Sequence, residues 1–388
     1  MKRKSLIVFI LTLGVFGIIN TEMGIIGLLP TISEHYHVSI SQAGLLVSLF
    51  ALIVALSGST LPLVFSGINR KMVMLLVLGV FILGNIVSTF APNFAILLIA
   101  RVVPAFFHPI YCSLAFTVAA ASVSKEEAPR AVSKVIIGVS GGMVLGVPVS
   151  SLIASTTSLG MAMIFFAVIN ATAFIATLIF VPSMPVKERL SYGAQLSVLK
   201  KPIVMISIIG VIFMNGAVFG VFSYLADYLE SVTRVPVHFI SLLLLVYGGA
   251  NIVGSIIAGK LLIKNAVKST VIFPFALGII YIILFLTGQL TVPMALITLA
   301  WGILGGVGAN INQYWITSAA PEAPDFANGL FITSTNLGTT AATTVCGFFI
   351  SGIGPQYVVL GGFLFLVLSA LTVFMRVSMD QPKKQLSK

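Results

Sequence analysis

Long apolar runs recur along the whole chain, and each is long enough to cross a lipid bilayer. A membrane-spanning helix needs about 20 consecutive apolar residues. The candidate runs are residues 5–32, 41–64, 72–91, 94–122, 135–156, 159–181, 203–229, 239–262, 269–288, 291–316, 328–350 and 357–376. A segment in lipid must satisfy its own backbone polar groups, so each run is predicted to be α-helical. The sequence therefore predicts an all-α integral membrane protein with 12 transmembrane helices.

The composition excludes the soluble proteins that the length alone would allow. A chain of 388 residues would ordinarily form two or three soluble domains. Here 58% of the residues are hydrophobic and only 8% are charged, whereas ordinary chains carry about 25% charged residues. The net charge of +11 could indicate nucleic acid, but the basic residues lie in short loops between apolar runs. We therefore expect a lipid bilayer around the protein and no nucleic-acid partner.

Short motifs give no sign of an enzyme. The chain has no Walker A pattern, no zinc-site spacing and no other enzyme motif, so neither a cofactor nor a metal is predicted. Cys112 and Cys346 both fall inside apolar runs, which predicts buried free thiols. The N-terminal MKRKSLIVFILTLGVFGII resembles a signal peptide, but no small-residue cleavage site follows it. We interpret it as a retained first span.

The basic residues predict how the chain is oriented in the membrane. With a cytoplasmic N-terminus, every Lys and Arg lies in a cytoplasmic segment except Arg234, which is outside, and Arg101, which is within a span. Such asymmetry is the rule for cytoplasmic loops. We expect a multi-pass protein of the plasma membrane with both termini in the cytoplasm. The loop between the tenth and eleventh spans departs from the pattern, because it carries Glu322 and Asp325 but no basic residue.

The longest loop lies at the middle of the chain and predicts two halves. Residues 181–202 combine Pro, Ser and mixed charge, as a linker would. The predicted organisation is an N-terminal six-helix half at 1–181, a cytoplasmic linker at 182–202 and a C-terminal six-helix half at 203–388. The halves also echo each other, since NRK follows the second span and GKLLIKNAVK the eighth. Such repeats are typical of transporters whose binding site lies between the halves.

The first span carries an acid in the stretch FGIINTEMGIIGLLP, residues 16–30. Glu22 is about ten residues from the outer end of the span, hence roughly 15 Å deep at 1.5 Å per residue. An ionised acid there costs about 2.5–3.5 kcal/mol on insertion scales, and such acids usually serve proton or ion pathways. We interpret Glu22 as a proton carrier or cation ligand, with a structural, hydrogen-bonded acid as the alternative.

The fourth span carries two further polar residues at a similar depth. Arg101 cannot lose its charge and needs an acceptor, which could be Glu22 or a backbone carbonyl. His108 lies two helical turns further along the same face. Glu22, Arg101 and His108 could therefore line one proton-coupling cavity. A neutral imidazole that forms a hydrogen bond between helices is the alternative for His108.

Small residues recur every four positions in the fifth span. Gly138, Gly142 and Gly146 share one helix face, and Pro148 follows them. This spacing favours close helix packing, and the proline favours a kink. We interpret the four residues as a conformational hinge, with generic helix packing as the alternative.

Aromatic and amide side chains of the second half form the candidate substrate site. Aromatic walls with a few amides suit a moderately apolar or amphipathic ligand, although each residue could serve helix packing alone. The predicted substrate-binding residues are Asn215, Phe219, Phe222, Tyr224, Tyr247, Asn251, Asn310, Asn312, Gln313 and Asn336.

Five segments resemble a known family. They are TEMGIIGLLPTIS in the first span, SISQAGLLVSLFAL into the second, RVVPAFFHP in the fourth, GVPVSS in the fifth and NLGTTAA in the eleventh. Together they resemble the major facilitator superfamily, in particular its 12-helix drug:proton antiporters and their sugar- and purine-efflux branch. Arg101 matches the family's arginine in the fourth span, although Ala105 replaces the usual glycine. In the loop between the second and third spans, Leu61 and Phe65 stand where the family has a glycine and an acid.

The resemblance implies a function. It implies a proton-coupled antiporter that exports small organic or amphipathic molecules, such as drugs, sugars, nucleosides or metabolites, by alternating access. The partners would be protons and a small-molecule substrate, and the protein would be monomeric. An uptake symporter or facilitator on the same fold stays open. A receptor or scaffold is more remote, because no loop is large enough for an output module.

Overall fold

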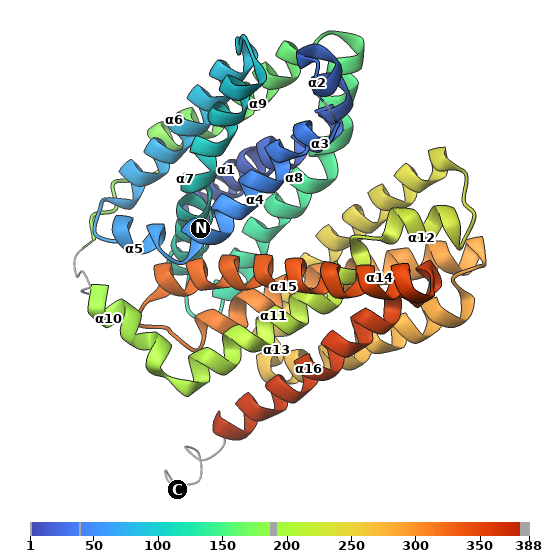
Figure 1. The fold of residues 1–388 in the computed structure, drawn as a ribbon. Helices are drawn as coiled ribbons and strands as arrows, with labels where there is room; N and C mark the ends of the chain where they lie inside the picture. The colour runs from blue at the N-terminus through green and yellow to red at the C-terminus, as the bar shows by residue number, and fades with distance from the viewer. Residues whose placement is uncertain (1, 39, 187–191, 381–388) are drawn as a thin grey trace, which may run out of the picture. The chain divides into compact units, whose positions relative to one another are not determined.

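A computed structural model describes residues 2–38, 40–186 and 192–380 (Figure 1). The described residues form helices and short connections, with no β-strand among them. The chain divides into two compact units, Met1–Ser191 and Tyr192–Lys388. The division falls within the segment 182–202 that we predict to be the linker.

The first unit contains nine α-helices and a 3-10 turn among its described residues. Helix α1 packs against α8 and α9, and α7 packs against α4 and α6. The elements are α1 (Lys2–Gly24), η1 (Ile25–Leu28), α2 (Leu29–Tyr36), α3 (Ile40–Ala43), α4 (Leu45–Gly58), α5 (Leu61–Phe65), α6 (Arg70–Thr89), α7 (Phe94–Ala121), α8 (Ala128–Thr156) and α9 (Leu159–Phe180).

Helix starts in this unit follow local sequence signals. The side chain of Asn93 accepts a hydrogen bond from the Ile96 N–H at 3.0 Å and begins α7. Ser158 does the same for the Met161 N–H at 3.2 Å and begins α9. Such caps satisfy backbone donors that have no partner within the helix.

Two predicted spans of the first unit are interrupted helices. The run 5–32 is divided among α1, η1 and the start of α2, and the run 41–64 among α3, α4 and α5. Pro30 lies in the first turn of α2 and Pro62 in the first turn of α5. Proline lacks the N–H that would continue a preceding helix, so new helical segments begin at these positions.

The second unit contains α10 to α16 and two 3-10 turns among its described residues. Helix α11 packs against α15 and α16, and α13 packs against α14 and α16. The elements are α10 (Tyr192–Ser197), η2 (Val198–Lys200), α11 (Pro202–Phe222), α12 (Leu225–Ser231), α13 (Val237–Thr287), α14 (Thr291–Thr317), α15 (Pro324–Ile353), η3 (Pro355–Tyr357) and α16 (Val358–Asp380).

Helix α13 contains two of the predicted spans, which meet at Asn265. This residue leaves helical geometry, with φ −165° and ψ 94°. Its side chain accepts a hydrogen bond from the Lys268 N–H at 2.9 Å, which caps the second arm. The seventh predicted span differs from the expectation, because the chain breaks at Ser223 and Tyr224 between α11 and α12.

Nine helical segments among the described residues are long and apolar enough to cross a membrane. Three fewer segments are found than the 12 predicted spans, for three reasons. Two of the predicted spans lie within α13, α4 has only 14 residues, and α15 is rich in Thr and Asn. Helices cover the predicted apolar runs apart from short breaks such as Ser223 and Tyr224, which agrees with the 12-helix fold.

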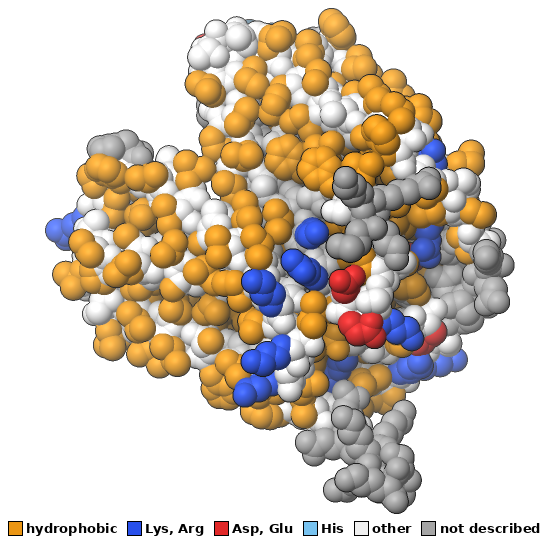
Figure 2. All heavy atoms as spheres, turned by 180° about the vertical axis from the view of Figure 1, so that it is seen from behind, with side chains coloured by type: hydrophobic (Ala, Val, Ile, Leu, Met, Phe, Trp, Pro, Cys, Tyr) orange, Lys and Arg blue, Asp and Glu red, His pale blue; other side chains and the backbone are white. Residues whose placement is uncertain are grey.

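Many large apolar side chains remain on the outside of the protein. Figure 2 shows hydrophobic side chains over most of the visible face. Leu286 and Phe348 are 72% and 73% exposed. Aqueous exposure of such side chains costs free energy, so these surfaces fit a lipid environment. Cys112 and Cys346 are buried free thiols, as predicted.

Candidate functional site

The acid of the first span pairs with the histidine of the fourth. Glu22 lies in the last turn of α1, and its Oε2 is 3.1 Å from Nε2 of His108 on α7. The two side chains are only 14% and 7% exposed. Phe50 of α4 packs edge-on against the imidazole, with ring centroids 6.1 Å apart. A carboxyl group and an imidazole thus share a largely buried position.

Arg101 lies beside this pair but binds a backbone carbonyl. Its Nη2 donates to the carbonyl oxygen of Thr21 at 2.6 Å, and the residue is 2% exposed. The guanidinium also lies over the Phe50 ring, 5.6 Å from the centroid. Of the two acceptors that the sequence left open, the Thr21 carbonyl therefore accepts the hydrogen bond from Arg101.

Sequence reasoning missed the polar residues around this turn. Asn20, Thr21, Asn85 and Asn170 are all buried, with Asn85 on α6 and Asn170 on α9. Neither polar atom of the Asn20 side chain has a hydrogen-bond partner within the described parts of the chain. The available signal was an amide inside an apolar run, because such a group needs a partner in lipid.

The three predicted hinge glycines of α8 face α1. A Cβ at Gly138 would collide with the carbonyl oxygen of Thr12, and one at Gly142 would lie 2.9 Å from Cβ of Ile19. At Gly146 the nearest atom would be the Gly24 nitrogen, 3.2 Å away. The helices therefore meet at backbone distance, which only small residues permit.

The structure does not show a break at the fourth predicted hinge residue. Pro148 is exposed, and α8 continues through it from Ala128 to Thr156. Two residues on, the Ser150 hydroxyl donates to the carbonyl oxygen of Gly24 at 2.7 Å. This bond ties α8 to the end of α1 near the glycine contacts.

Three of the predicted substrate residues meet in an aromatic cluster of the second unit. Phe222 stacks on Tyr247 with ring centroids 4.3 Å apart, and Phe219 lies 5.9 Å from Phe222. Trp301 of α14 meets Tyr247 edge-on at 5.6 Å. Tyr281 meets Trp301 at the same distance. Trp301 and Tyr281 were not predicted, because a sequence does not show which aromatic faces converge from different helices.

Two other predicted residues form hydrogen bonds to α15, one from within α11 and one from the short connection that follows it. The side-chain amide of Asn215 donates to the Thr335 carbonyl at 2.8 Å and to the Thr339 hydroxyl at 2.9 Å. The Tyr224 hydroxyl donates to the Thr343 carbonyl at 3.0 Å. These contacts make both residues ties between helices of the second unit.

The remaining amides divide between two regions. Asn251 lies one turn from Tyr247, and its Nδ2 would be 2.9 Å from a Cβ at Gly305. Asn336 donates to Ile332 of its own helix at 2.8 Å.

The other group lies toward the end of α14. Gln313 is about 18 Å beyond Trp301 along the helix axis at 1.5 Å per residue, and it donates to the Asn328 side chain at 2.8 Å. Asn310 and Asn312 are buried in the same stretch of α14. The structure therefore does not gather all the predicted substrate residues in one place.

The acidic loop between α14 and α15 has a simple structural explanation. Lys201 pairs with Glu322, and both side chains are exposed. The sequence suggested that Asp325 is a loop residue. The structure instead places it in the first turn of α15, where it is buried. An acid is favourable at a helix N-terminus.

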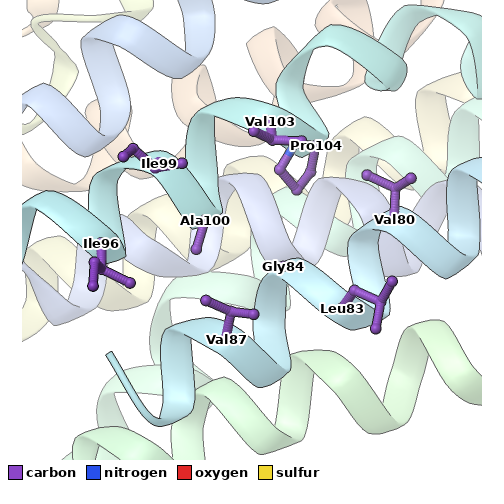
Figure 3. Close-up of a pocket in the computed structure, with 9 residues that line it drawn as sticks. All are labelled: Val80, Leu83, Gly84, Val87, Ile96, Ile99, Ala100, Val103 and Pro104. Carbon is purple, nitrogen blue, oxygen red and sulfur yellow. The ribbon is translucent and has the colours of Figure 1, made fainter. Parts of the chain in front are cut away.

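A cavity of about 330 Å³ lies between α6 and α7, lined by nine residues without charged or polar side chains (Figure 3). A Cβ at Gly84 would lie 2.6 Å from Cγ of Pro104 and 2.7 Å from the Ala100 carbonyl. None of the predicted site residues lines this cavity. It is therefore separate from both the proton-coupling residues and the predicted substrate residues.

Comparisons with known proteins identify transporters across nearly the whole chain. A family model described as Major Facilitator Superfamily matches residues 11–324. The inner membrane transport protein YdhP of Escherichia coli K12 is 26% identical over 366 residues, which cover 94% of each chain. The uncharacterized MFS-type transporter YtbD of Bacillus subtilis 168 is 28% identical, with 99% of each chain covered.

Two solved structures share the fold. One is the human organic anion transporter MFSD10, with a TM-score of 0.80, 15% identity and coverage of 96% of this chain and 99% of that chain. The other is the E. coli fucose:proton symporter FucP, with a TM-score of 0.76, 15% identity and coverage of 94% and 97%. At such low identity, these structures indicate the fold alone.

Proposed function

This chain belongs to the Major Facilitator Superfamily, and we propose that it is a proton-coupled antiporter that exports small organic or amphipathic molecules. The family and the relatives make it a multi-pass membrane transporter of a small-molecule substrate. Proton coupling, export and the substrate class are our proposals. We also propose that it is monomeric. Both termini are proposed to lie in the cytoplasm, because basic residues are concentrated in the predicted cytoplasmic segments.

The buried contact between Glu22 and His108 carries the proposal. A carboxyl group and an imidazole 3.1 Å apart can hold one proton between them or gain a second, which changes the charge of the site. Charge inside a membrane is costly, so a change of protonation alters the relative free energies of the conformations. A ligand shifts only those states that it binds differently. Proton binding can therefore bias which face of the transporter is open.

Arg101 adds a fixed positive charge to this arrangement. Its guanidinium stays protonated and is held at the Thr21 carbonyl, next along the chain from Glu22. We propose that this charge compensates the negative charge of Glu22 when the proton has left for water in the open site. His108 would accept or return the proton across the 3.1 Å contact.

We propose the partly exposed edge of the aromatic cluster as the substrate-binding surface. Phe219, Phe222, Asn251 and Asn336 keep some accessible surface, whereas Tyr247 is 4% exposed. Aromatic faces with a few polar groups suit an amphipathic ligand. Among the buried residues of the predicted set, Asn215 and Gln313 use their amides within the unit, and we propose that they support this surface from behind.

Two observations bear on the direction of transport. One structural neighbour is described as a proton symporter, so the fold supports either direction. The glycine spacing of α8, which resembles the antiporter motif, favours export.

The test is transport in proteoliposomes with an imposed pH gradient and an enclosed pH-sensitive dye. A panel would include a lipophilic cation, a sugar and a nucleoside, each radiolabelled. Antiport predicts that a transported compound and protons move in opposite directions. Movement in the same direction would contradict antiport and support a symporter.

A further inference from the structure

One hydroxyl group ties three helices together beside the proton-coupling pair. The Thr21 Oγ1 on α1 accepts hydrogen bonds from the Asn170 amide of α9 at 2.9 Å and the Asn85 amide of α6 at 3.3 Å. It donates its own hydrogen to the Gly17 carbonyl at 2.9 Å. A hydroxyl offers one donor and two acceptor sites. All of the hydrogen-bonding capacity of Thr21 Oγ1 is therefore used.

The backbone of the same residue is held by a fourth helix. The Thr21 carbonyl accepts the bond from Arg101 of α7 at 2.6 Å. The residues in this network, Thr21, Asn85, Arg101 and Asn170, are each at most 3% exposed. Buried bonds of this kind are not exchanged for water, so they restrict how α1 can turn about its axis.

Close packing allows the amide of α9 to reach α1. A Cβ at Gly17 would lie only 3.1 Å from Oδ1 of Asn170. Gly17 therefore leaves room for Asn170, whose Nδ2 also lies 3.3 Å from the Gly17 carbonyl.

Glu22 is the residue next to this anchored threonine. Successive residues on a helix point about 100° apart, so the orientation of Thr21 sets the direction in which Glu22 points. Helix α1 passes into the 3-10 turn η1 two residues later, after Gly24, so Glu22 lies close to a change of helical geometry. The bonds to Thr21 hold the turn that carries Glu22.

We propose that Asn85 and Asn170, acting through Thr21, are positioning residues that keep Glu22 within hydrogen-bond distance of His108. In doing so they set the pH range over which Glu22 binds a proton. The role of this range in transport rests on the proposed function, whereas the positioning itself does not.

The surroundings of Glu22 make this geometric effect measurable. The titratable side chains that face it from α7 are Arg101, which binds the adjacent Thr21 carbonyl, and His108. Further along α7, Cys112 lies 3.8 Å from His108 and the Tyr111 ring lies against Gly14. Helices α4 and α9 have no titratable side chain, and those of α6 and α8 lie in their first turns or close to them. A change in Thr21, Asn85 or Asn170 therefore alters no charge and acts on Glu22 through position.

The test follows the Glu22 proton directly, by infrared titration of the purified protein in lipid nanodiscs. The carboxyl C=O band of Glu22 is assigned by its loss in Glu22→Gln. Thr21→Val and Asn170→Leu should each raise the pH at which half of this band is lost, by about one pH unit, because the carboxylate loses a stabilising neighbour. The double variant should shift no further than the larger single shift.

Two variants serve as controls. Thr21→Ser keeps the hydroxyl and should keep the wild-type midpoint. Thr298→Val removes a buried hydroxyl that bonds the carbonyl four residues earlier in α14, at 2.8 Å, and should leave the Glu22 midpoint unchanged. If Thr21→Val does not fold, Asn85→Leu removes only the 3.3 Å bond and should produce a smaller shift in the same direction.

The outcomes separate the two proposals. Unchanged midpoints in Thr21→Val and Asn170→Leu, together with lower thermal stability, would overturn the positioning role. If the midpoints shift but Glu22→Gln still transports normally against a proton gradient, the positioning role stands and proton coupling by Glu22 fails.

Discussion

Arg101 donates to the carbonyl oxygen of Thr21 at 2.6 Å, while the adjacent Glu22 pairs with His108 at 3.1 Å. Arg101 and His108 of α7 therefore contact the last turn of α1 at successive positions. Arg101 binds the backbone of the last turn of α1, just before the chain passes into η1. His108 acts on the side chain that can carry a proton.

Arg101→Ala should impair transport more than Arg101→Lys. Lysine keeps the positive charge near Thr21 and Glu22 but loses the planar guanidinium, whereas alanine removes both. Loss of a hydrogen bond from a charged group should also lower the free energy of unfolding by about 1.5–3 kcal/mol. Flux in proteoliposomes and thermal unfolding would be measured together. Wild-type flux in the alanine variant would show that the arginine serves packing only.

Gly146→Leu should reduce flux while the protein still binds substrate. The side chain would enter the contact with Gly24 and the Asn20 carbonyl, at 3.2 Å and 3.4 Å from the ideal Cβ position. Overpacking of this kind costs about 1–3 kcal/mol. We expect the two open states to use the α1–α8 contact differently, so the substitution should trap one of them. Equilibrium binding and proton-driven flux would be compared in the same preparation.

A glycine in open space provides the control for this prediction. Among the described residues, no atom outside the local helix backbone lies within 4 Å of the Cβ position at Gly352, so Gly352→Leu should leave flux unchanged. Gly138→Ala should be more harmful than Gly146→Ala, because the Gly138 Cβ would collide with the Thr12 carbonyl. Normal flux in Gly146→Leu would contradict the hinge interpretation, and loss of both folding and binding would indicate a purely structural role.

Phe222→Ala should weaken substrate binding by roughly 3- to 10-fold. We propose that the accessible edge of this ring contacts the substrate, and an aromatic contact is worth about 0.5–1.5 kcal/mol beyond its buried area. Phe285→Ala, which removes an exposed ring from α13, is the matched control. Equal affinities for the two variants would place the substrate elsewhere.

Glu322→Gln should lower stability slightly at neutral pH and not at all in acid. Partial burial would raise the pKa of Glu322, but hydrogen bonds from Lys201 and the backbone outweigh burial and lower the pKa below its ordinary value. A lowered carboxyl pKa stabilises the fold above the unfolded-state pKa, and this contribution disappears as pH falls through the folded-state pKa.

Solvent screens this exposed pair, so the effect at pH 7 should be below about 1 kcal/mol. Thermal unfolding of wild type and variant from pH 7 to about pH 3 would measure it. A difference that persists at the acid end would show that the ion pair is not its source.

The helical spans were predictable because length and apolarity are local properties of the chain. The interruptions within these spans were harder to predict. Pro30 and Pro62 offered a signal for the breaks in the first two spans. The break at Ser223 had no such signal, and its hydroxyl contacts Thr343 at 3.1 Å on a distant part of the chain. Contacts of that kind cannot be inferred from a local pattern.

The first unit's site was partly predictable from depth alone. Helical rise placed Glu22, Arg101 and His108 at similar levels, and the structure brings them together around the end of α1. Helical rise could not indicate that His108, and not Arg101, contacts the carboxyl group of Glu22. This contact depends on how α1 is rotated about its axis. In the second unit, depth did not help in the same way, since Phe222 and Gln313 belong to separate regions.

The central claim is that Glu22 carries the coupled proton, and flux by Glu22→Gln tests it most directly. The amide resembles the protonated acid in shape and polarity but cannot release a proton. In proteoliposomes the variant should fold and exchange substrate down its own gradient, yet fail to concentrate substrate in response to a pH gradient. Full gradient-driven accumulation by Glu22→Gln would contradict the account.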